Sequence, residues 1–205
     1  MRLNITKDSL DYLSRQDAVL GEIIQKYGIL DLELRDDLFS SLVSTIIGQQ
    51  LSNKATDTIT ARVRQAVGDF TAKNFVSADV SELRKCGVSN QKLSYIIELA
   101  EKVLSGEIDL ESVKLLDDDK LIASLQRIKG IGKWSAEMTA LFSLGRMNIF
   151  CYEDVALRNA VIKFHNYKTL SPRRFEILRN KYKPYCSIAS VYYYHAYDNG
   201  FRLER

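Results

Sequence analysis

Two features of the sequence could bind or transform a ligand: a hairpin rich in lysine and glycine, and a single aspartate. The hairpin residues are Lys129, Gly130, Ile131, Gly132 and Lys133, and the aspartate is Asp154. A helix that begins after Gly132 presents backbone N–H groups and a partial positive charge, and glycine lets a phosphate oxygen approach them closely. The two lysines add charge, so the hairpin predicts contact with a phosphate backbone whatever the base sequence. A short Gly-x-Gly pattern is also typical of a tight corner between helices, and that alternative stays open.

Asp154 precedes the run 155–164, which is a plausible helix. An aspartate in that position favours simple capping of the helix, but capping and chemistry are compatible. A carboxylate held at a helix N-terminus can stabilise a developing positive charge or activate a water molecule. Glu153 is the competing candidate, and we expect it to face solvent or a neighbouring cation.

Helices are predicted to hold the hairpin and the aspartate. Apolar residues recur at helical spacing over 9–27, 37–50, 92–105, 117–127, 133–144 and 188–197. Ser52 is predicted to cap a helix that ends at Gly68, and Ser171-Pro172 to begin another. Only 76–80 and 147–152 are strand-like, and both are short. The sequence therefore predicts an all-α fold.

Composition limits the size and class of the protein. The chain has 205 residues, with 29 Lys plus Arg against 26 Asp plus Glu, a net charge of +3. This length suits one unit made of two small lobes, and the mild charge permits nucleic-acid binding without requiring it. Without a low-complexity linker, we expect interleaved lobes: a helical bundle over 35–115, and a second lobe formed by 1–34 and 116–205 that carries the hairpin element 117–144. No apolar run is long enough to cross a bilayer and the first residues lack a secretory segment, so we expect a cytoplasmic location.

Cysteines and histidines show no metal-ligand spacing. The cysteines are far apart and odd in number, namely Cys86, Cys151 and Cys186. They form no disulfide framework, and an iron–sulfur cluster normally needs four thiolates. His165 and His195 are isolated, so both are expected to be structural.

The full stretch 125–154 resembles the helix-hairpin-helix of the DNA glycosylase superfamily, in which a Gly/Pro-rich loop and an aspartate follow the hairpin. The loop here keeps Gly145 but has no proline. The segment 41–55, which contains Gln-Gln-Leu-Ser, and the weaker match 90–96 resemble two further motifs of that superfamily. Together these matches are most similar to the alkylation-repair branch, the 3-methyladenine DNA glycosylase II type.

The resemblance implies roles for individual residues. Asp154 would stabilise the positive charge that develops at C1′ of the sugar as a base leaves. Bifunctional relatives carry a nucleophilic lysine at the place of Trp134, so no Schiff base and no strand cleavage are expected. Trp134 and Met138 would line the base pocket, although a core position for the tryptophan is the alternative. The residues expected to bind DNA are Lys129, Gly130, Ile131, Gly132, Lys133 and Ser135.

Two further sites follow from the same resemblance. A wedge that fills the space left by a flipped base would come from Gln49, Gln50 or Leu51, with Leu51 more typical of a core residue. Backbone carbonyls of Gln126, Ile128 and Ile131 would hold a structural Na⁺ or K⁺, and no other cofactor is expected.

The sequence thus predicts a monomeric glycosylase that removes alkylated purines from damaged duplex DNA, with no membrane partner and with access to the nucleoid. The alternatives are a non-catalytic DNA-binding module that uses the same hairpin, and a glycosylase for oxidised or deaminated purines. Two positions depart from the family pattern: Met138 stands where relatives often have an aromatic residue, and Cys186 where they have an arginine. The first departure bears on the range of bases removed. Because of the second, a structural or DNA-facing role of that arginine does not carry over to this chain.

Overall fold

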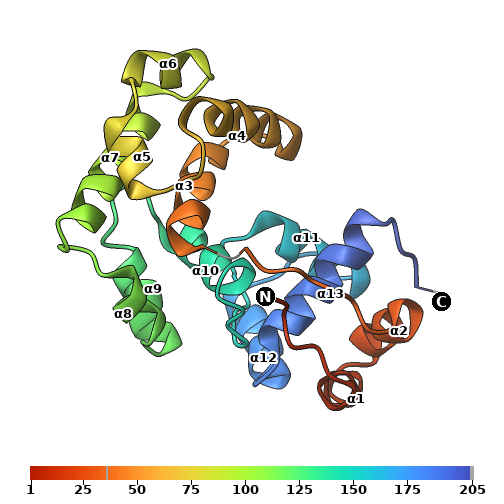
Figure 1. Ribbon diagram of the computed structural model, residues 1–205. Coiled ribbons are helices and arrows are strands. Elements are labelled where there is room, and N and C mark those ends of the chain that lie inside the picture. Colours follow the sequence, from red (N-terminus) through yellow and green to blue (C-terminus); the bar gives the residue numbers. More distant parts are fainter. Residues whose placement is uncertain (36, 204–205) are drawn as a thin grey trace. The chain divides into compact units, whose positions relative to one another are not determined.

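The computed structural model describes residues 1–35 and 37–203, and these residues form thirteen α-helices (Figure 1). Within the described span there is no extended strand, only an isolated bridge between Arg2 and Glu33. The all-α prediction is confirmed. None of the helices formed by the described residues has the length and apolarity needed to cross a bilayer.

The chain divides into two compact units, which are described separately. The first consists of 1–34 together with 140–205, and the second of 35–139. The chain passes between the units twice, and the second passage lies at 139/140, whereas the expected lobes have this boundary at 115/116.

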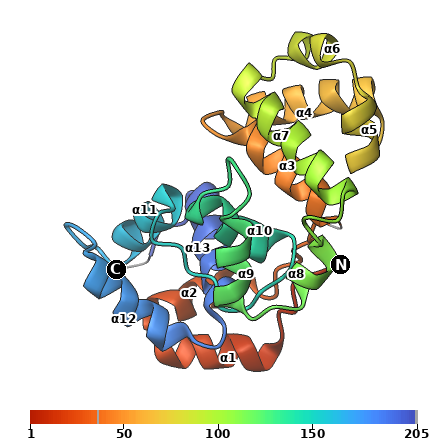
Figure 2. The ribbon, with the colours of Figure 1, turned by 90° about the vertical axis from the view of Figure 1, so that its left-hand side faces the viewer.

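The unit 35–139 is built around α3 (Leu38–Gly48) and α7 (Asn90–Leu104), which pack against each other. Figure 2 shows α5 alongside α7 and α4 alongside α3. The reason is local: α3 is apolar nearly all round and buries most of its side chains, so it must be covered on several sides. The remaining helices are α4 (Asn53–Val67), α5 (Ala72–Ser77), α6 (Val80–Lys85), α8 (Leu110–Lys114), α9 (Asp118–Leu125) and the first part of α10 (Lys133–Phe142).

Most helices of this unit begin at a side chain that accepts a hydrogen bond from the first turn. The predicted cap Ser52 accepts from the amide of Ala55 at 3.3 Å, and Gly68 ends α4 with φ +75°. The other capping residues are Asp37, Thr71, Asp79, Ser89, Asp109 and Asp117. These short-range signals explain why the helix starts were predictable.

The segment 116–139 joins the unit 35–139 because the hairpin is tied to α3 and α7. Lys129 Nζ lies 3.3 Å from Glu98 Oε2, and Gln49 Nε2 donates to the Gly130 carbonyl at 2.6 Å. These partners are far apart in sequence, so the expected lobe boundary could not take them into account.

The unit of 1–34 and 140–205 is built around α13 (Cys186–Asp198), shown in blue in Figure 1. This helix is buried on almost every side and packs against α2 (Ala18–Tyr27), α11 (Val155–Phe164) and α12 (Pro172–Tyr182). The remaining helix, α1 (Lys7–Gln16), packs mainly on α2. Because α13 is covered all round, the loop that precedes α11 rests on a rigid support.

The predicted single helix over 9–27 is wrong, because the chain breaks at Asp17. Its carboxylate caps α2, accepting from the amides of Val19 at 2.9 Å and Leu20 at 3.2 Å. The other carboxylate oxygen accepts from the Tyr182 hydroxyl at 2.6 Å. Two apolar stripes on either side of this break look like one stripe in the sequence.

The two strand-like segments are also not strands. Residues 76–80 comprise the end of α5, a two-residue connection and the first residue of α6, whereas 147–152 form a loop ahead of α11. The helices α5, α6 and α8 have only five or six residues each, too few to give a clear helical period.

Candidate functional site

The hairpin joins α9 to α10 through a tight turn anchored by two buried isoleucines. The amide of Ile131 donates to the carbonyl of Ile128 at 3.0 Å, and both side chains are buried. The carbonyl of Gly132 then accepts from the amide of Ala136 at 2.9 Å, which starts α10. Ile131 therefore points into the core, and Gly132 occupies the N-cap position of α10.

The two glycines of the hairpin have different surroundings. Gly130 has φ +86°, and a Cβ atom there would lie 2.3 Å from Cδ2 of Tyr95. Both the backbone conformation and the close approach therefore require glycine at this position. Gly132 has no left-handed φ, and a Cβ atom there would meet nothing within 4 Å. Its lack of a side chain is unexplained by the fold and leaves the start of α10 open to a ligand.

The lysines of the hairpin are exposed. Lys129 Nζ lies 3.3 Å from Glu98 Oε2 and 5.7 Å from the centroid of the Tyr95 ring. The hydrogen bond from Lys129 is the largest cause of the lowered pKa of the Glu98 carboxyl. Lys133 is exposed in the first turn of α10. Positively charged side chains thus lie on both sides of Gly132.

Ser135 has a different environment from the rest of the predicted DNA-binding set. Its side chain is only 3% exposed, and its hydroxyl lies 3.4 Å from Nε2 of Gln49. The same amide donates to the Gly130 carbonyl at 2.6 Å. The structure therefore brings Gln49 and Ser135 together beneath the hairpin, which the sequence did not predict, and it buries the Ser135 side chain.

The end of α3 carries the three wedge candidates. Gln49 is turned toward the hairpin, whereas Gln50 is exposed and has φ +59°, unusual for a residue other than glycine. Leu51 is 38% exposed, so its expected core position is wrong. The physical reason is a turn in which the Leu51 amide donates to the carbonyl of Gly48 at 3.1 Å, and this turn points the following residues outward.

Lys92 is a residue of this region that the sequence did not single out. Its ammonium donates to the carbonyls of Ile47 at 2.8 Å and Gln49 at 2.7 Å. Partial burial lowers the pKa of the Lys92 amine. The Lys92 ammonium therefore binds carbonyls at the C-terminal end of α3, where the helix dipole stabilises a positive charge.

Trp134 and Met138 lie one turn apart on α10, so they share a face of the helix. Trp134 is 40% exposed, which excludes the alternative of a core tryptophan. Met138 is half-buried. A partly exposed indole next to a flexible thioether can form an apolar wall for an aromatic ligand.

Asp154 is the N-cap of α11, and its side chain is only 7% exposed. Oδ1 accepts from the amide of Leu157 at 2.7 Å. The amide and the helix N-terminus both stabilise the carboxylate anion. Glu153, the competing candidate, is exposed, as expected.

Two serines of α13 hold the loop that leads to Asp154. Ser187 Oγ accepts from the amide of Ile149 at 2.9 Å and also donates to the carbonyl of Arg146. Ser190 Oγ donates to the carbonyl of Ile149 at 3.0 Å. Both serines are buried, and a pair spaced by three residues in an otherwise apolar helix is the signal that could have identified them.

Cys186, at the position where the family often has arginine, is a core residue. It is fully buried, its thiol lies 3.2 Å from the carbonyl of Arg179, and burial raises its pKa to about 11. Tyr192 and Tyr193 of the same helix are also fully buried. These residues support α11 and α12 from within.

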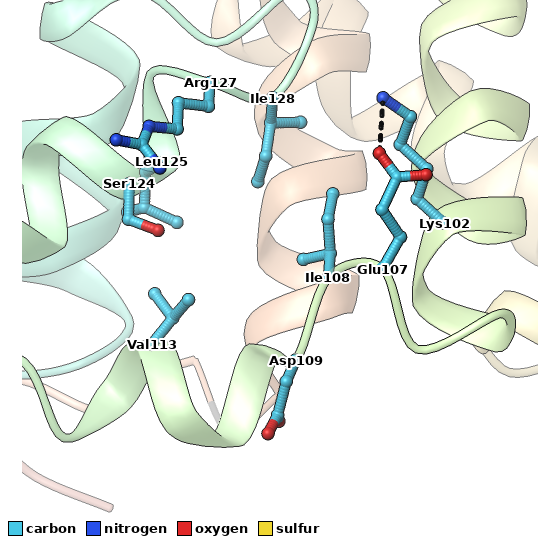
Figure 3. A pocket seen from close by; sticks show the side chains of 9 residues that line it. All are labelled: Lys102, Glu107, Ile108, Asp109, Val113, Ser124, Leu125, Arg127 and Ile128. Atoms are coloured by element: carbon cyan, nitrogen blue, oxygen red, sulfur yellow. Dashed lines mark ion pairs between the residues drawn. The ribbon is translucent and has the colours of Figure 1, made fainter.

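A cleft of about 230 Å³ lies beside the hairpin in the unit 35–139 (Figure 3). Ile108, Val113 and Ile128 point into it, and the ion pair between Lys102 and Glu107, at 3.2 Å, closes one edge. Trp134 and Met138 do not line this cleft. It is smaller than the ~300–1,000 Å³ of typical ligand pockets, so it is a packing gap behind the hairpin rather than the predicted base pocket.

Comparisons with known proteins identify the family of this chain. Residues 43–184 match the HhH-GPD superfamily base excision DNA repair protein family. An alkylbase DNA glycosidase-like protein of Schizosaccharomyces pombe is 30% identical over 190 residues, which cover 88% of this chain and 89% of that protein. Several other relatives are longer; the chain spans 47% of the DNA-3-methyladenine glycosylase of Saccharomyces cerevisiae, which is 34% identical over 139 residues.

Solved structures give the same result. A DNA-3-methyladenine glycosidase of Bacillus halodurans has a TM-score of 0.82 at 31% identity, covering 96% of this chain and 92% of that one. A 3-methyladenine DNA glycosylase of Schizosaccharomyces pombe, in complex with abasic DNA, has a TM-score of 0.82 at 25% identity, covering 94% and 97%. With its hairpin, its aspartate and a family match over most of its length, this chain belongs to the HhH-GPD superfamily of base excision DNA repair proteins.

Proposed function

We propose that this protein is a monofunctional DNA glycosylase that removes alkylated purines from duplex DNA as the first step of base excision repair. The observation that carries the proposal is Asp154, a buried carboxylate held at the N-terminus of α11 by a hydrogen bond from Leu157. The family membership and the relatives named as 3-methyladenine glycosylases support the same reaction.

The proposed reaction is hydrolysis of the bond between C1′ and the purine nitrogen. A purine methylated at N3 or N7 is cationic, so it leaves as a neutral base when it takes the bonding electron pair. The sugar then carries positive charge near C1′, which the Asp154 carboxylate stabilises in a water-poor site. Water adds to C1′ and loses one proton, and Asp154 is placed to orient that water or accept the proton.

Trp134 and Met138 are proposed as the wall that receives the flipped base. The face of an indole attracts a cationic ring, which favours alkylated purines over normal ones. The tryptophan also stands where a bifunctional enzyme has its nucleophilic lysine, so no Schiff base forms and the product is an intact strand with an abasic site. Met138 replaces an aromatic residue frequent in relatives, and its flexible side chain makes the wall less rigid.

The hairpin is proposed as the grip on the DNA backbone. Gly132 leaves the start of α10 uncovered, and Lys129 and Lys133 supply charge beside it. The proposed wedge is Gln50 or Leu51, because the Gln49 side chain is hydrogen-bonded to Gly130 and Ser135. A wedge is needed because a flipped base leaves a gap in the stack.

The same hairpin is proposed to hold a monovalent cation through the carbonyls of Gln126, Ile128 and Ile131. The Ile128 carbonyl accepts one hydrogen bond, from Ile131, and a carbonyl oxygen has a second lone pair for a cation. The ion would add positive charge next to the phosphate. Replacing K⁺ by choline at constant ionic strength should lower the melting temperature and the affinity for DNA together; equal values in both salts would contradict this site.

We also propose that the protein acts as a monomer in the compartment that holds the chromosome. The proposed reaction needs one hairpin and one carboxylate, and a single chain supplies both. Sedimentation of the free protein and of its complex with a short duplex tests this proposal, and a dimeric free protein would contradict it.

The test of function is release of free base from duplex DNA containing 7-methylguanine or 3-methyladenine. Wild type should release the base and leave the strand intact, while Asp154→Asn should release it about 10²–10³-fold more slowly. Asp79→Asn is the matched control, because Asp79 is also an N-cap carboxylate, 2.7 Å from the amide of Ser81, on the exposed helix α6. Failure of wild type to release either base would favour a non-catalytic DNA-binding module. A covalent adduct trapped by borohydride would contradict the monofunctional assignment.

A further inference from the structure

The end of α3 and the hairpin are connected through one stripe of α7. Lys92, Tyr95 and Glu98 are spaced by three residues, so they lie along one face of that helix. Lys92 binds the carbonyls at the end of α3, Tyr95 packs against Gly130, and Glu98 pairs with Lys129. One helix thus supports both segments that are proposed to touch DNA.

Gln49 forms a direct link between the same two segments. Its backbone carbonyl accepts from Lys92 at 2.7 Å, while its side-chain Nε2 donates to the Gly130 carbonyl at 2.6 Å. The backbone and side chain of one residue are therefore both engaged, one by α7 and the other by the hairpin. The same side-chain amide also donates to Ser135 Oγ at 3.4 Å, in the first turn of α10.

The residue that follows is the exposed Gln50, which has φ +59°. An L-residue adopts this conformation rarely, and it persists where neighbouring bonds hold the chain on both sides. The Lys92 bond to the Gln49 carbonyl and the Leu51 bond to the Gly48 carbonyl provide this support. The tip formed by Gln50 and Leu51 is therefore held in one conformation.

We propose that Gln49 and Lys92 are positioning residues that fix the Gln50–Leu51 tip relative to the hairpin. The hairpin can then bind the DNA backbone and the tip can enter the base stack without any change in their relative position. This proposal rests on the proposed function, because it assigns a role in extruding the damaged base. Neither residue needs to touch the base or the sugar. Their loss should slow base extrusion while the hairpin still binds duplex DNA.

Two variants remove the links with little change in shape. Gln49→Glu keeps the size of the side chain but replaces the donor facing the Gly130 carbonyl by an oxygen. Lys92→Met keeps most of the chain length and removes the ammonium, and Lys92→Arg restores a cationic donor. The matched controls are Gln65→Glu on α4 and Lys85→Met on α6, both at exposed positions.

Three measurements are made on the full chain. The first is the single-turnover rate of 7-methylguanine release at saturating enzyme. The second is the fluorescence rise of 2-aminopurine placed next to a tetrahydrofuran abasic analogue, which reports unstacking without any chemistry. The third is the affinity for an undamaged duplex, together with the melting temperature.

The expected result is a loss of about 10- to 100-fold in the rate for Gln49→Glu and Lys92→Met, as for other misplaced groups, with a smaller fluorescence rise. Affinity for undamaged duplex should fall much less than the rate, because Lys129, Gly132 and Lys133, which are proposed to bind the backbone, are not altered. Lys92→Arg should recover most of the rate, and the controls should match wild type.

Two results would overturn the proposal. One is a wild-type rate and a wild-type fluorescence rise in both variants. The other is a fall in duplex affinity and melting temperature that parallels the rate, since this would show a general structural role. If wild type releases no alkylated base, the proposed function fails. The positioning role is then decided by fluorescence alone: a reduced rise at unchanged affinity supports it, and equal rises overturn it.

Discussion

The N-termini of α10 and α11 handle negative charge in opposite ways. α11 begins at Asp154, whose own carboxylate accepts from the first turn at 2.7 Å. α10 begins at Gly132, which has no side chain to offer and no steric reason to be glycine. Helix N-termini attract anions, so the difference is in where the anion comes from. At α11 the anion belongs to the protein and is proposed to act on the sugar, whereas at α10 it is proposed to be a phosphate of the DNA.

The first prediction separates a capping role of Asp154 from a catalytic role. Asp154→Ala should slow base release by about 10²–10³-fold, because the charge that stabilises the sugar cation is gone. It should also lower the free energy of unfolding by about 1 kcal/mol, because the cap is lost. Asp154→Asn should share the first effect and not the second. Single-turnover assays and denaturant titration measure the two quantities. Equal rates for both variants and wild type would show that Asp154 is only a cap.

The second prediction concerns the glycine of the hairpin that the fold does require. Gly130→Ala places a side chain in the left-handed region and against the Tyr95 ring, so the free energy of unfolding should fall by about 2–4 kcal/mol. Gly106→Ala is the matched control, because Gly106 has φ +78° but nothing within 4 Å of a Cβ atom. Gly106→Ala should lower the free energy of unfolding only by the cost of the left-handed backbone conformation, about 1–2 kcal/mol.

A double variant tests the cause. Tyr95→Ala combined with Gly130→Ala should lose less than the sum of the single changes, because the clash is relieved. Strict additivity would mean that the ring contact does not explain Gly130. Denaturant titrations of the four proteins measure this coupling.

The third prediction concerns a variant in which α10, like α11, is capped by an aspartate. Gly132→Asp adds a cap to α10 and a negative charge where phosphate is proposed to bind, so affinity for every duplex should fall by about 10- to 100-fold. Gly132→Asn adds a neutral cap of the same shape and should lose less. Both variants should fold, since a Cβ atom at Gly132 has open space.

Fluorescence anisotropy with several duplexes of different sequence is the measurement for this pair. A loss confined to one sequence would contradict binding through the backbone. Equal losses of affinity for Gly132→Asp and Gly132→Asn would show that the size of the side chain, and not its charge, weakens binding.

Both regions were predictable where the signal is local, and not where it is distant in sequence. Ser52 and Gly68 mark the ends of α4 within one turn, and Asp154 marks the start of α11 in the same way. The break at Asp17 was missed because part of its reason is Tyr182, which is 165 residues away. From the sequence, Gln49 is a wedge candidate, because nothing in the Gln-Gln pair indicates that its side chain binds Gly130, which lies 81 residues away. Ser187 and Ser190 likewise hold a loop about 40 residues earlier, which helical periodicity cannot reveal.

The fourth prediction tests whether the charge of Lys129, beside Gly132, contributes to DNA binding. Lys129 is paired with Glu98 at 3.3 Å in the free protein, so it must exchange a carboxylate for a phosphate on binding. If it does, Lys129→Gln should lower the slope of log K against log salt by about 0.9 and weaken all duplexes alike. Lys85→Gln is the control, because Lys85 pairs with Glu82 at 2.6 Å in a similar exposed ion pair on α6. An unchanged slope for Lys129→Gln would mean that Lys129 stays with Glu98. The open N-terminus of α10 would then depend on its backbone and on Lys133 for its attraction to phosphate.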